Sequence, residues 1–184
     1  MIRLVYRSKK ESQTDTELND QEKAIATNAY RLLDDWKTPL GMKKDGSFSE
    51  EDFSSWLELT KSLCNESGHF EVALTHIGGV LVYSPPDLDG LWINEVVADA
   101  LYSKDADKMR RGFTLKLLNS RGGHWVDPTG QPVRDLAVKY RLQAEDVENA
   151  GYQRFAASIR GLSDSYYRDA ERIIAEHQQV DMEL

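Results

Sequence analysis

Apolar residues recur along most of this 184-residue chain at the spacing of three to four positions that an amphipathic α-helix requires. Ile25, Ala29, Leu32, Leu33 and Trp36 form one such stripe. The same spacing predicts seven helices, at residues 19–36, 49–64, 68–83, 92–101, 106–118, 133–149 and 152–177. We therefore expect an all-α fold, an irregular bundle of about seven helices.

The last two predicted helices are separated only by residues 149–151. Such a short connection makes the second helix fold back along the first, so the chain should end in a long antiparallel helical hairpin. Gly151 is expected at the end of the first helix of this pair, because glycine readily adopts the left-handed conformation that stops a helix.

The two ends of the chain differ from its body. Ile2, Leu4 and Tyr6 alternate with other residues, which predicts a short strand or, alternatively, a frayed segment. We expect an N-terminal segment and linker at residues 1–18, a single helical domain at 19–178 and a frayed tail at 179–184.

Gly78 and Gly79 lie inside the helix predicted at 68–83. Glycine within a helix costs about 1 kcal/mol relative to alanine, so the pair should either break the helix or serve a packing role. We favour the packing role, in which a neighbouring backbone comes very close to the helix at this point.

Composition narrows the classes of protein to consider. A net charge of −8 argues against a surface that binds nucleic acid or an anionic membrane over its whole extent, although a local basic patch fits. The single cysteine, Cys64, excludes a disulfide within the chain and a four-cysteine zinc site. No run of about 18 apolar residues and no signal peptide are found, so we expect a cytoplasmic protein without membrane contact.

Two Asp-Gly pairs resemble parts of a calcium-binding EF-hand loop. Asp45-Gly46 would place Gly41 and Lys43 at the first and third ligand positions, where calcium needs oxygen atoms. Asp89-Gly90 would place Val96 where a bidentate glutamate is needed. We interpret both pairs as turns that lead into helices, with the aspartate facing the exposed amides of the helix start.

Other catalytic and metal-binding patterns are also incomplete. His69 and His76 are seven residues apart, about 10 Å along a helix, which is too far to share one ion. The Glu66-x-x-His69 spacing of di-iron proteins occurs without a second copy, and Cys64 is expected to be a core or half-buried thiol without a neighbouring base. No phosphate-binding glycine loop or nucleophile elbow is present, so we assign no catalytic residue, metal ligand or cofactor.

The segment from Lys104 to Trp125 is a basic island in this acidic chain. Its candidate anion-binding residues are Lys108, Arg110, Arg111 and Lys116. The loop that follows supplies candidate partner-binding residues, Arg121, His124 and Trp125, because arginine and tryptophan contribute strongly at interfaces. The alternative is structural: the arginines cap the end of the preceding helix and Trp125 folds back into the core.

Several short motifs are spread over most of the chain from about residue 20. They are Asn28-Ala-Tyr-Arg-Leu-Leu33 with Trp36, Pro39-Leu-Gly41, Asp45-Gly46 with Trp56, Ile77-Gly78, Asp89-Gly90-Leu-Trp92, Asn119-Ser-Arg-Gly122, Arg134-Asp-Leu-Ala137 with Tyr140, and Leu162-Ser-Asp-Ser-Tyr166. In their order they resemble the C-terminal helical region of large, uncharacterised bacterial proteins. The resemblance implies no activity, but it implies that this chain is a terminal helical module of a larger protein or a short relative of one.

These observations lead to three hypotheses about function. The first is a non-catalytic helical protein-interaction module that binds a protein partner or an adjoining domain. The second, less favoured, is a nucleic-acid-associated regulator that uses the basic face at 104–121. The third is an enzyme whose site forms between helices from dispersed residues such as Glu66, His69, His76 and His124.

Overall fold

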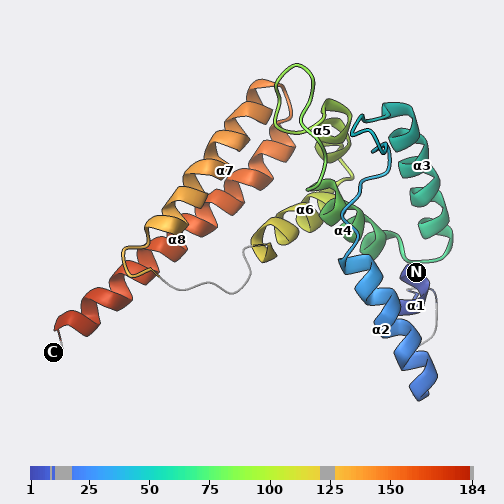
Figure 1. The fold of residues 1–184 in the computed structure, drawn as a ribbon, viewed down its shortest axis with the longest axis horizontal. Coiled ribbons are helices and arrows are strands. Elements are labelled where there is room, and N and C mark those ends of the chain that lie inside the picture. The colour runs from blue at the N-terminus through green and yellow to red at the C-terminus, as the bar shows by residue number, and fades with distance from the viewer. Residues whose placement is uncertain (9, 11–17, 121–126, 183–184) are drawn as a thin grey trace. The chain divides into compact units, whose positions relative to one another are not determined.

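A computed structural model describes residues 1–8, 10, 18–120 and 127–182 of the chain, with side chains up to residue 178. These residues form eight helices and no β-strand, so the all-α prediction is confirmed (Figure 1). The helices are α1 (Ile2–Val5), α2 (Asp20–Asp34), α3 (Glu50–Glu66), α4 (Phe70–Leu81), α5 (Glu95–Tyr102), α6 (Asp107–Asn119), α7 (Gln131–Asn149) and α8 (Gln153–Met182). The seven predicted helices correspond to α2 to α8, and none of the described helices is long and apolar enough to cross a membrane.

The first residues form the one-turn helix α1, so the alternative of a short strand was wrong. Leu4 N–H donates to the carbonyl of Met1, and Tyr6 N–H donates to that of Ile2. A strand is stable only when a second strand pairs with it, and the described residues supply none. Local helical hydrogen bonds therefore satisfy these backbone groups instead.

Two helix boundaries differ from the prediction by three residues or more. Helix α5 begins at Glu95 instead of residue 92, because the Asn94 side chain caps it by accepting a hydrogen bond from Val96 N–H at 3.1 Å. Helix α8 continues to Met182, past the predicted end at residue 177, since no glycine or proline interrupts the final residues.

Contacts divide the chain into two compact units. Unit 1 comprises residues 1–85 and 105–113, and unit 2 comprises residues 86–104 and 114–184. Unit 1 therefore contains α1 to α4 and the first part of α6, while unit 2 contains α5, the rest of α6, α7 and α8. The single domain expected over residues 19–178 stays a prediction.

The helix starts in unit 1 follow from local capping. Asn19 and Glu22 form a reciprocal capping box at the start of α2, and Ser49 accepts a hydrogen bond from Asp52 N–H at the start of α3. The core of unit 1 is formed by buried apolar side chains of α2, α3, α4 and α6, namely Leu33, Phe53, Leu57, Ala73, Leu74, Ile77, Leu81, Met109 and Phe113.

Helices α4 and α6 meet backbone to backbone through two glycines. A Cβ atom added to Gly78 would lie 1.9 Å from the carbonyl oxygen of Met109, and one added to Gly112 would lie 1.9 Å from that of Thr75. The close packing predicted for Gly78 is therefore confirmed, and the helix continues through it. Gly112, on the opposite helix, has the same role and was not predicted.

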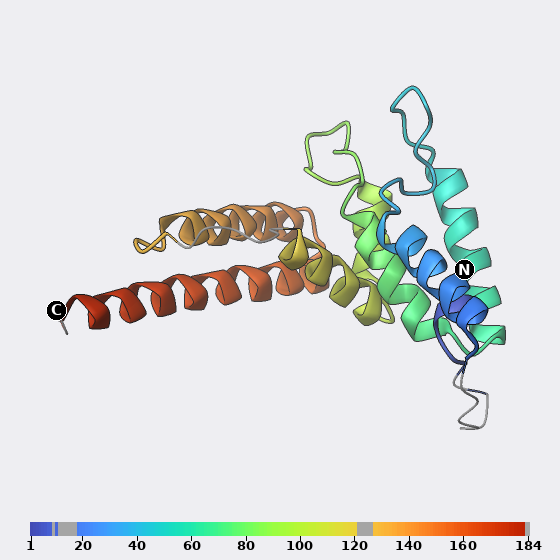
Figure 2. The same cartoon turned by 60° about the horizontal axis from the view of Figure 1, so that its bottom comes forward.

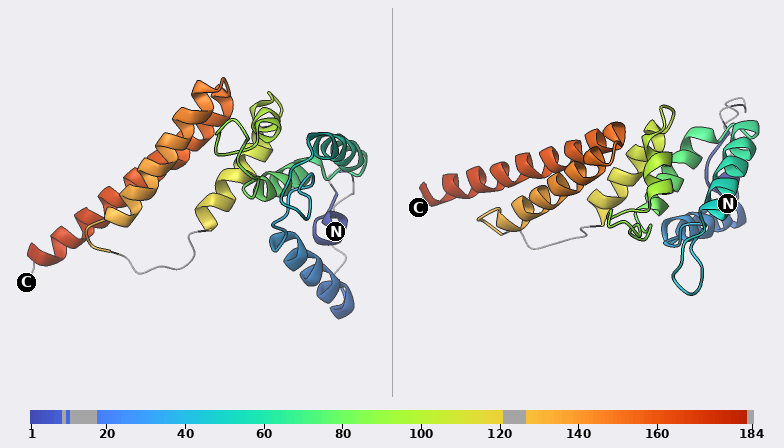
Figure 3. Two further views of the ribbon diagram at one scale, coloured as in Figure 1. Left: turned by 45° about the horizontal axis from the view of Figure 1, so that its top comes forward. Right: turned by 90° about the horizontal axis from the view of Figure 1, so that it is seen from above.

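In unit 2, α7 and α8 form the predicted antiparallel hairpin. Figure 2 shows the two helices side by side, with the end of α8 extending past the start of α7, as also seen in Figure 3. Gly151 ends the first helix with a φ of 99°, in agreement with its predicted role. Tyr140 and Tyr166 stack at 5.6 Å between the helices, and the buried Ser163 hydroxyl donates to the Ala137 carbonyl at 2.7 Å.

The two Asp-Gly pairs do form turns, with φ values of 85° at Gly46 and 96° at Gly90. The predicted role of their aspartates was wrong, however. Asp45 accepts hydrogen bonds from the amide and hydroxyl of Ser47 within the turn. At the second turn Asp87, two residues before Asp89, accepts from the Glu95 N–H at the start of α5. The local turn geometry decides which carboxylate reaches an amide.

We expect Gly78→Ala and Gly112→Ala each to destabilise the protein by about 1–3 kcal/mol, because the added methyl group forces α4 and α6 apart. Gly161→Ala is the matched control: Gly161 is also helical, but nothing lies within 4 Å of its Cβ position, so alanine should be neutral or stabilising. Urea unfolding followed by circular dichroism measures the difference. A Gly78→Ala midpoint equal to or above that of the parent protein would contradict the close contact.

Candidate functional site

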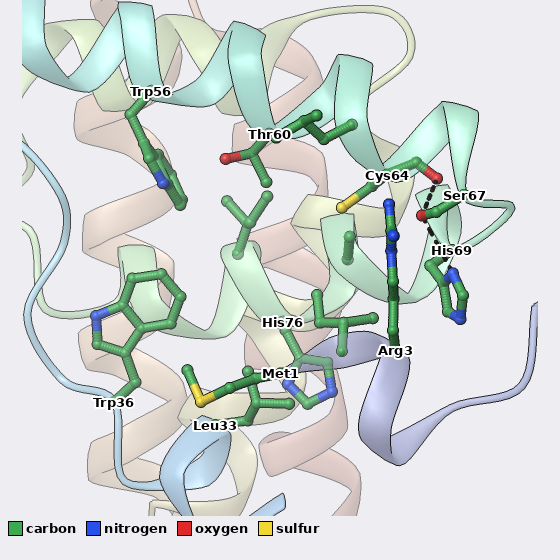
Figure 4. Close-up of a pocket in the computed structure, with 14 residues that line it drawn as sticks. Met1, Arg3, Leu33, Trp36, Trp56, Thr60, Cys64, Ser67, His69 and His76 are labelled. Carbon is green, nitrogen blue, oxygen red and sulfur yellow. Dashed lines mark hydrogen bonds between the residues drawn. The ribbon is translucent and has the colours of Figure 1, made fainter. Parts of the chain in front are cut away.

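A pocket of about 390 Å³ lies within unit 1, at the meeting point of α1, α2, α3 and α4 (Figure 4). Its apolar wall is formed by Leu33, Trp36, Trp56, Leu63, Ala73 and Ile77, with Met1 and Ile2 of α1. Its polar lining is formed by Arg3, Thr60, Cys64, Ser67, His69 and His76. In Figure 4 the two tryptophans are at one end and the polar group around Arg3 and His69 is at the other.

The aromatic end of the pocket is held in a defined geometry. Trp36, which follows α2, and Trp56 on α3 meet edge to face, with ring centroids 5.8 Å apart and an interplanar angle of 85°. The Trp36 indole N–H also donates to the Thr38 carbonyl at 2.7 Å, which orients the ring. Both tryptophans are only half-buried, so part of each ring faces the pocket and is available to a ligand.

His69 is buried and uses both ring nitrogens within the structure. Its Nε2 lies 2.9 Å from the Tyr6 carbonyl oxygen, and because a carbonyl only accepts, Nε2 must carry the proton. Its Nδ1 lies 3.2 Å from the hydroxyl of Ser67. His69 therefore joins the N-terminal segment to the turn between α3 and α4, and these bonds occupy the ring.

His76, about two helix turns further along the chain, contacts the same tyrosine. Its Nε2 lies 2.8 Å from the Tyr6 hydroxyl, and the two rings are 5.4 Å apart. The two histidines thus hold opposite ends of one residue. Among the described residues, no three His, Cys, Asp or Glu side chains are grouped so that they could hold a metal ion.

The N-terminal segment continues this attachment beyond Tyr6. The buried Ser8 hydroxyl donates to the Ser67 carbonyl at 2.7 Å, and the Lys10 ammonium donates to the Glu66 carbonyl at 2.8 Å. Gly68, with a φ of 73°, leaves room for this approach, because a Cβ there would lie 2.3 Å from Ser8 Oγ. We call the contacts of Tyr6, Ser8 and Lys10 with the α3–α4 turn and α4 the N-terminal clasp.

Cys64 is the half-buried thiol that the sequence predicted. Burial raises the pKa of this thiol, while the nearby positive charge of Arg3 opposes the rise. The thiolate is therefore scarce near neutral pH, which does not suit a nucleophile. The role of Cys64 in the pocket is to contribute apolar surface.

Arg3 differs from the other polar residues of the pocket. Among the described residues its guanidinium makes no hydrogen bond and no ion pair, although it lines both the pocket and an adjoining polar hollow of about 320 Å³ that also contains Glu66. The sequence analysis does not predict Arg3 as a site residue. The signal for it is local charge, because the first ten residues contain four basic residues and no acidic one.

The four predicted anion-binding residues do not line this pocket. Lys108 pairs with Glu71 at 3.5 Å, and helix geometry places Arg110 on the opposite side of α6 from Lys108. Arg111 is exposed and Lys116 is half-buried. Arg121, His124 and Trp125 lie outside the described residues, so their assignment stays a prediction.

Unit 2 contains a polar hollow of about 510 Å³ with a different character. It is lined by Asp87, Asp89, Glu95 and Asp146, together with Tyr152. The Tyr152 hydroxyl donates to Glu95 at 3.1 Å, and burial together with this carboxylate raises its pKa to about 12. Tyr152 is thus a stable donor to a carboxylate, and the hollow has neither the apolar wall nor the unpaired cation of the unit 1 pocket.

Comparison of the chain with protein-family models, with curated proteins and with solved structures finds no match. The case for function therefore rests on the geometry of the site.

We expect Ser8→Ala to loosen the N-terminal clasp, because it removes the hydroxyl that bonds the Ser67 carbonyl and accepts from Lys10 N–H. The free energy of opening the clasp should fall by about 1 kcal/mol. The fraction of molecules with an open clasp, and with it the rate of tryptic cleavage after Arg7, should therefore rise about fivefold. Mass spectrometry of a limited digest measures the rate. Ser158→Ala, which removes a hydroxyl bonded to the Arg154 carbonyl within α8 of unit 2, should leave this cleavage unchanged. Parent-like cleavage in Ser8→Ala would show that the clasp does not hold the segment.

The raised pKa of Cys64 predicts slow alkylation. At pH 7.5 iodoacetamide should modify the folded chain more slowly than the urea-unfolded chain, because only the thiolate reacts and burial reduces its fraction. The rate should rise with pH from 7 to 9 without reaching a plateau. Intact-mass spectrometry over time gives both rates, and a plateau below pH 8 would show that the pKa is lowered instead.

Proposed function

We propose that this chain is a non-catalytic helical protein-interaction module and that the unit 1 pocket is its binding surface. The observation that carries the proposal is the pair of half-buried tryptophans, Trp36 and Trp56, in an open apolar pocket. Tryptophan contributes more binding energy than most residues at protein interfaces, because it offers a large, rigid apolar surface.

Apolar surface continues outside the pocket, which supports a polypeptide partner. On α3, Leu59, one turn before the pocket residue Leu63, is 60% exposed, and on α1, Leu4 is 54% exposed. A single small molecule within the pocket would leave these side chains in water. A partner segment with several apolar residues covers them as well.

The polar residues of the pocket also favour binding over catalysis. His69, His76 and Ser67 have their side chains engaged in contacts of the clasp and the turn beside it, and burial keeps the Cys64 thiol protonated near neutral pH. An enzyme would need a base or nucleophile directed at a substrate. We also propose a cytoplasmic location, which fits a chain with a single cysteine.

A substitution that fills the pocket tests this proposal. Thr60, on α3, is half-buried and lines the pocket, so Thr60→Phe should occupy the space that a partner needs. Ser55→Phe is the matched control, because Ser55 is exposed on the same helix and does not line the pocket. Affinity purification of each variant with quantitative mass spectrometry should show partner proteins recovered equally by the parent and Ser55→Phe, and about tenfold less by Thr60→Phe.

Equal recovery by all three proteins would remove the pocket from the binding surface. Circular dichroism of each variant should give the spectrum of the parent protein. A matching spectrum excludes a folding defect as the cause of reduced partner recovery.

A further inference from the structure

The charge around the pocket differs from that of the chain as a whole. The net charge is −8, yet residues 1–10 contain Arg3, Arg7, Lys9 and Lys10 and no acidic residue. The clasp holds Tyr6, Ser8 and Lys10 of this segment against the α3–α4 turn, beside the pocket. Lys10 donates to a backbone carbonyl, so its positive charge is not neutralised by a carboxylate in that contact.

Arg3 is the basic residue that reaches the pocket itself. Figure 4 shows its side chain extending from α1 along Cys64 and Ser67, at the opposite end from the tryptophans. Its guanidinium has no ion pair among the described residues, and the Glu66 carboxylate in the adjoining hollow accepts instead from the Ser62 hydroxyl at 3.4 Å. A guanidinium beside apolar surface suits a carboxylate, which it can bind through two parallel hydrogen bonds.

We propose that the partner is a short polypeptide segment with a bulky apolar side chain that enters the pocket and an adjacent acidic residue that pairs with Arg3. This inference rests on the proposed function and specifies its partner. The pocket volume of about 390 Å³ is enough for one or two large side chains, and the exposed leucines along α3 receive the apolar residues that follow. Specificity then comes from charge, since a basic residue beside the apolar side chain would be repelled.

Labelled peptides of the form Gly-Ser-Z-X-X-Z-Ser-Gly test the inference by fluorescence anisotropy with the full chain, where X is Leu, Phe or Ala and Z is Glu, Gln or Lys. We expect Leu and Phe peptides to bind about tenfold more tightly than Ala peptides, and Glu peptides about three- to tenfold more tightly than Gln peptides. Lys peptides should bind weakest. Arg3→Gln should remove the preference for Glu over Gln while keeping that for Leu over Ala.

Lys44→Gln is the control for the change in net charge, because Lys44 is an exposed basic residue of unit 1 that does not line the pocket. It should keep the preference for Glu. Equal binding of Glu, Gln and Lys peptides, or a Glu preference that survives Arg3→Gln, would overturn the acidic partner and leave the pocket as the interaction surface.

Two other results would contradict the proposed function itself, and not only the acidic partner. If no peptide binds at millimolar concentration while anilinonaphthalene sulfonate does, and Thr60→Phe abolishes that dye binding, the pocket is a small-molecule site and both proposals fall. If peptides bind equally to the parent and Thr60→Phe, they bind outside the pocket, and both proposals again fall.

Discussion

Helices α4 and α6 are in backbone contact because glycine occupies both contact points, Gly78 on one helix and Gly112 on the other. The position of α4 within unit 1 depends on this contact. One side of α4 meets α6, while Ala73, His76 and Ile77 line the pocket. Any side chain at either glycine would displace α4 and so change the shape of the pocket, because packed interiors cannot absorb the added volume without movement.

The second constraint on the pocket is the attachment of the N-terminal segment. His69 and His76 bond the carbonyl and the hydroxyl of Tyr6, across sequence separations of 63 and 70 residues. His69 and His76, which the sequence analysis names among candidate site residues, thus attach the N-terminal segment to the rest of unit 1. The pocket residues outside this attachment include the edge-to-face pair of Trp36 and Trp56 and the Arg3 guanidinium.

The helices themselves could be predicted because their signals are local. Apolar spacing identified α2 to α8, Ser49 and Gly151 marked a helix start and a helix end, and the short connection at 149–151 required the hairpin. The predictions for the N-terminal strand and for the turn aspartates were wrong, because the same local pattern is compatible with two structures. Alternation at Ile2, Leu4 and Tyr6 fits a strand only when a partner strand exists, and an aspartate before glycine faces a helix amide only when the turn directs it there.

The sequence by itself therefore determined the all-α class, the order of the helices from α2 onward and the hairpin of α7 and α8, because each depends on residues within a few positions of one another. Only the tertiary structure decided which backbone approaches Gly78 and what His69 and His76 bind. It also decided that Arg3, Trp36 and Trp56 line one pocket. These features join residues tens of positions apart, and periodicity along a chain carries no information about which distant segments come together.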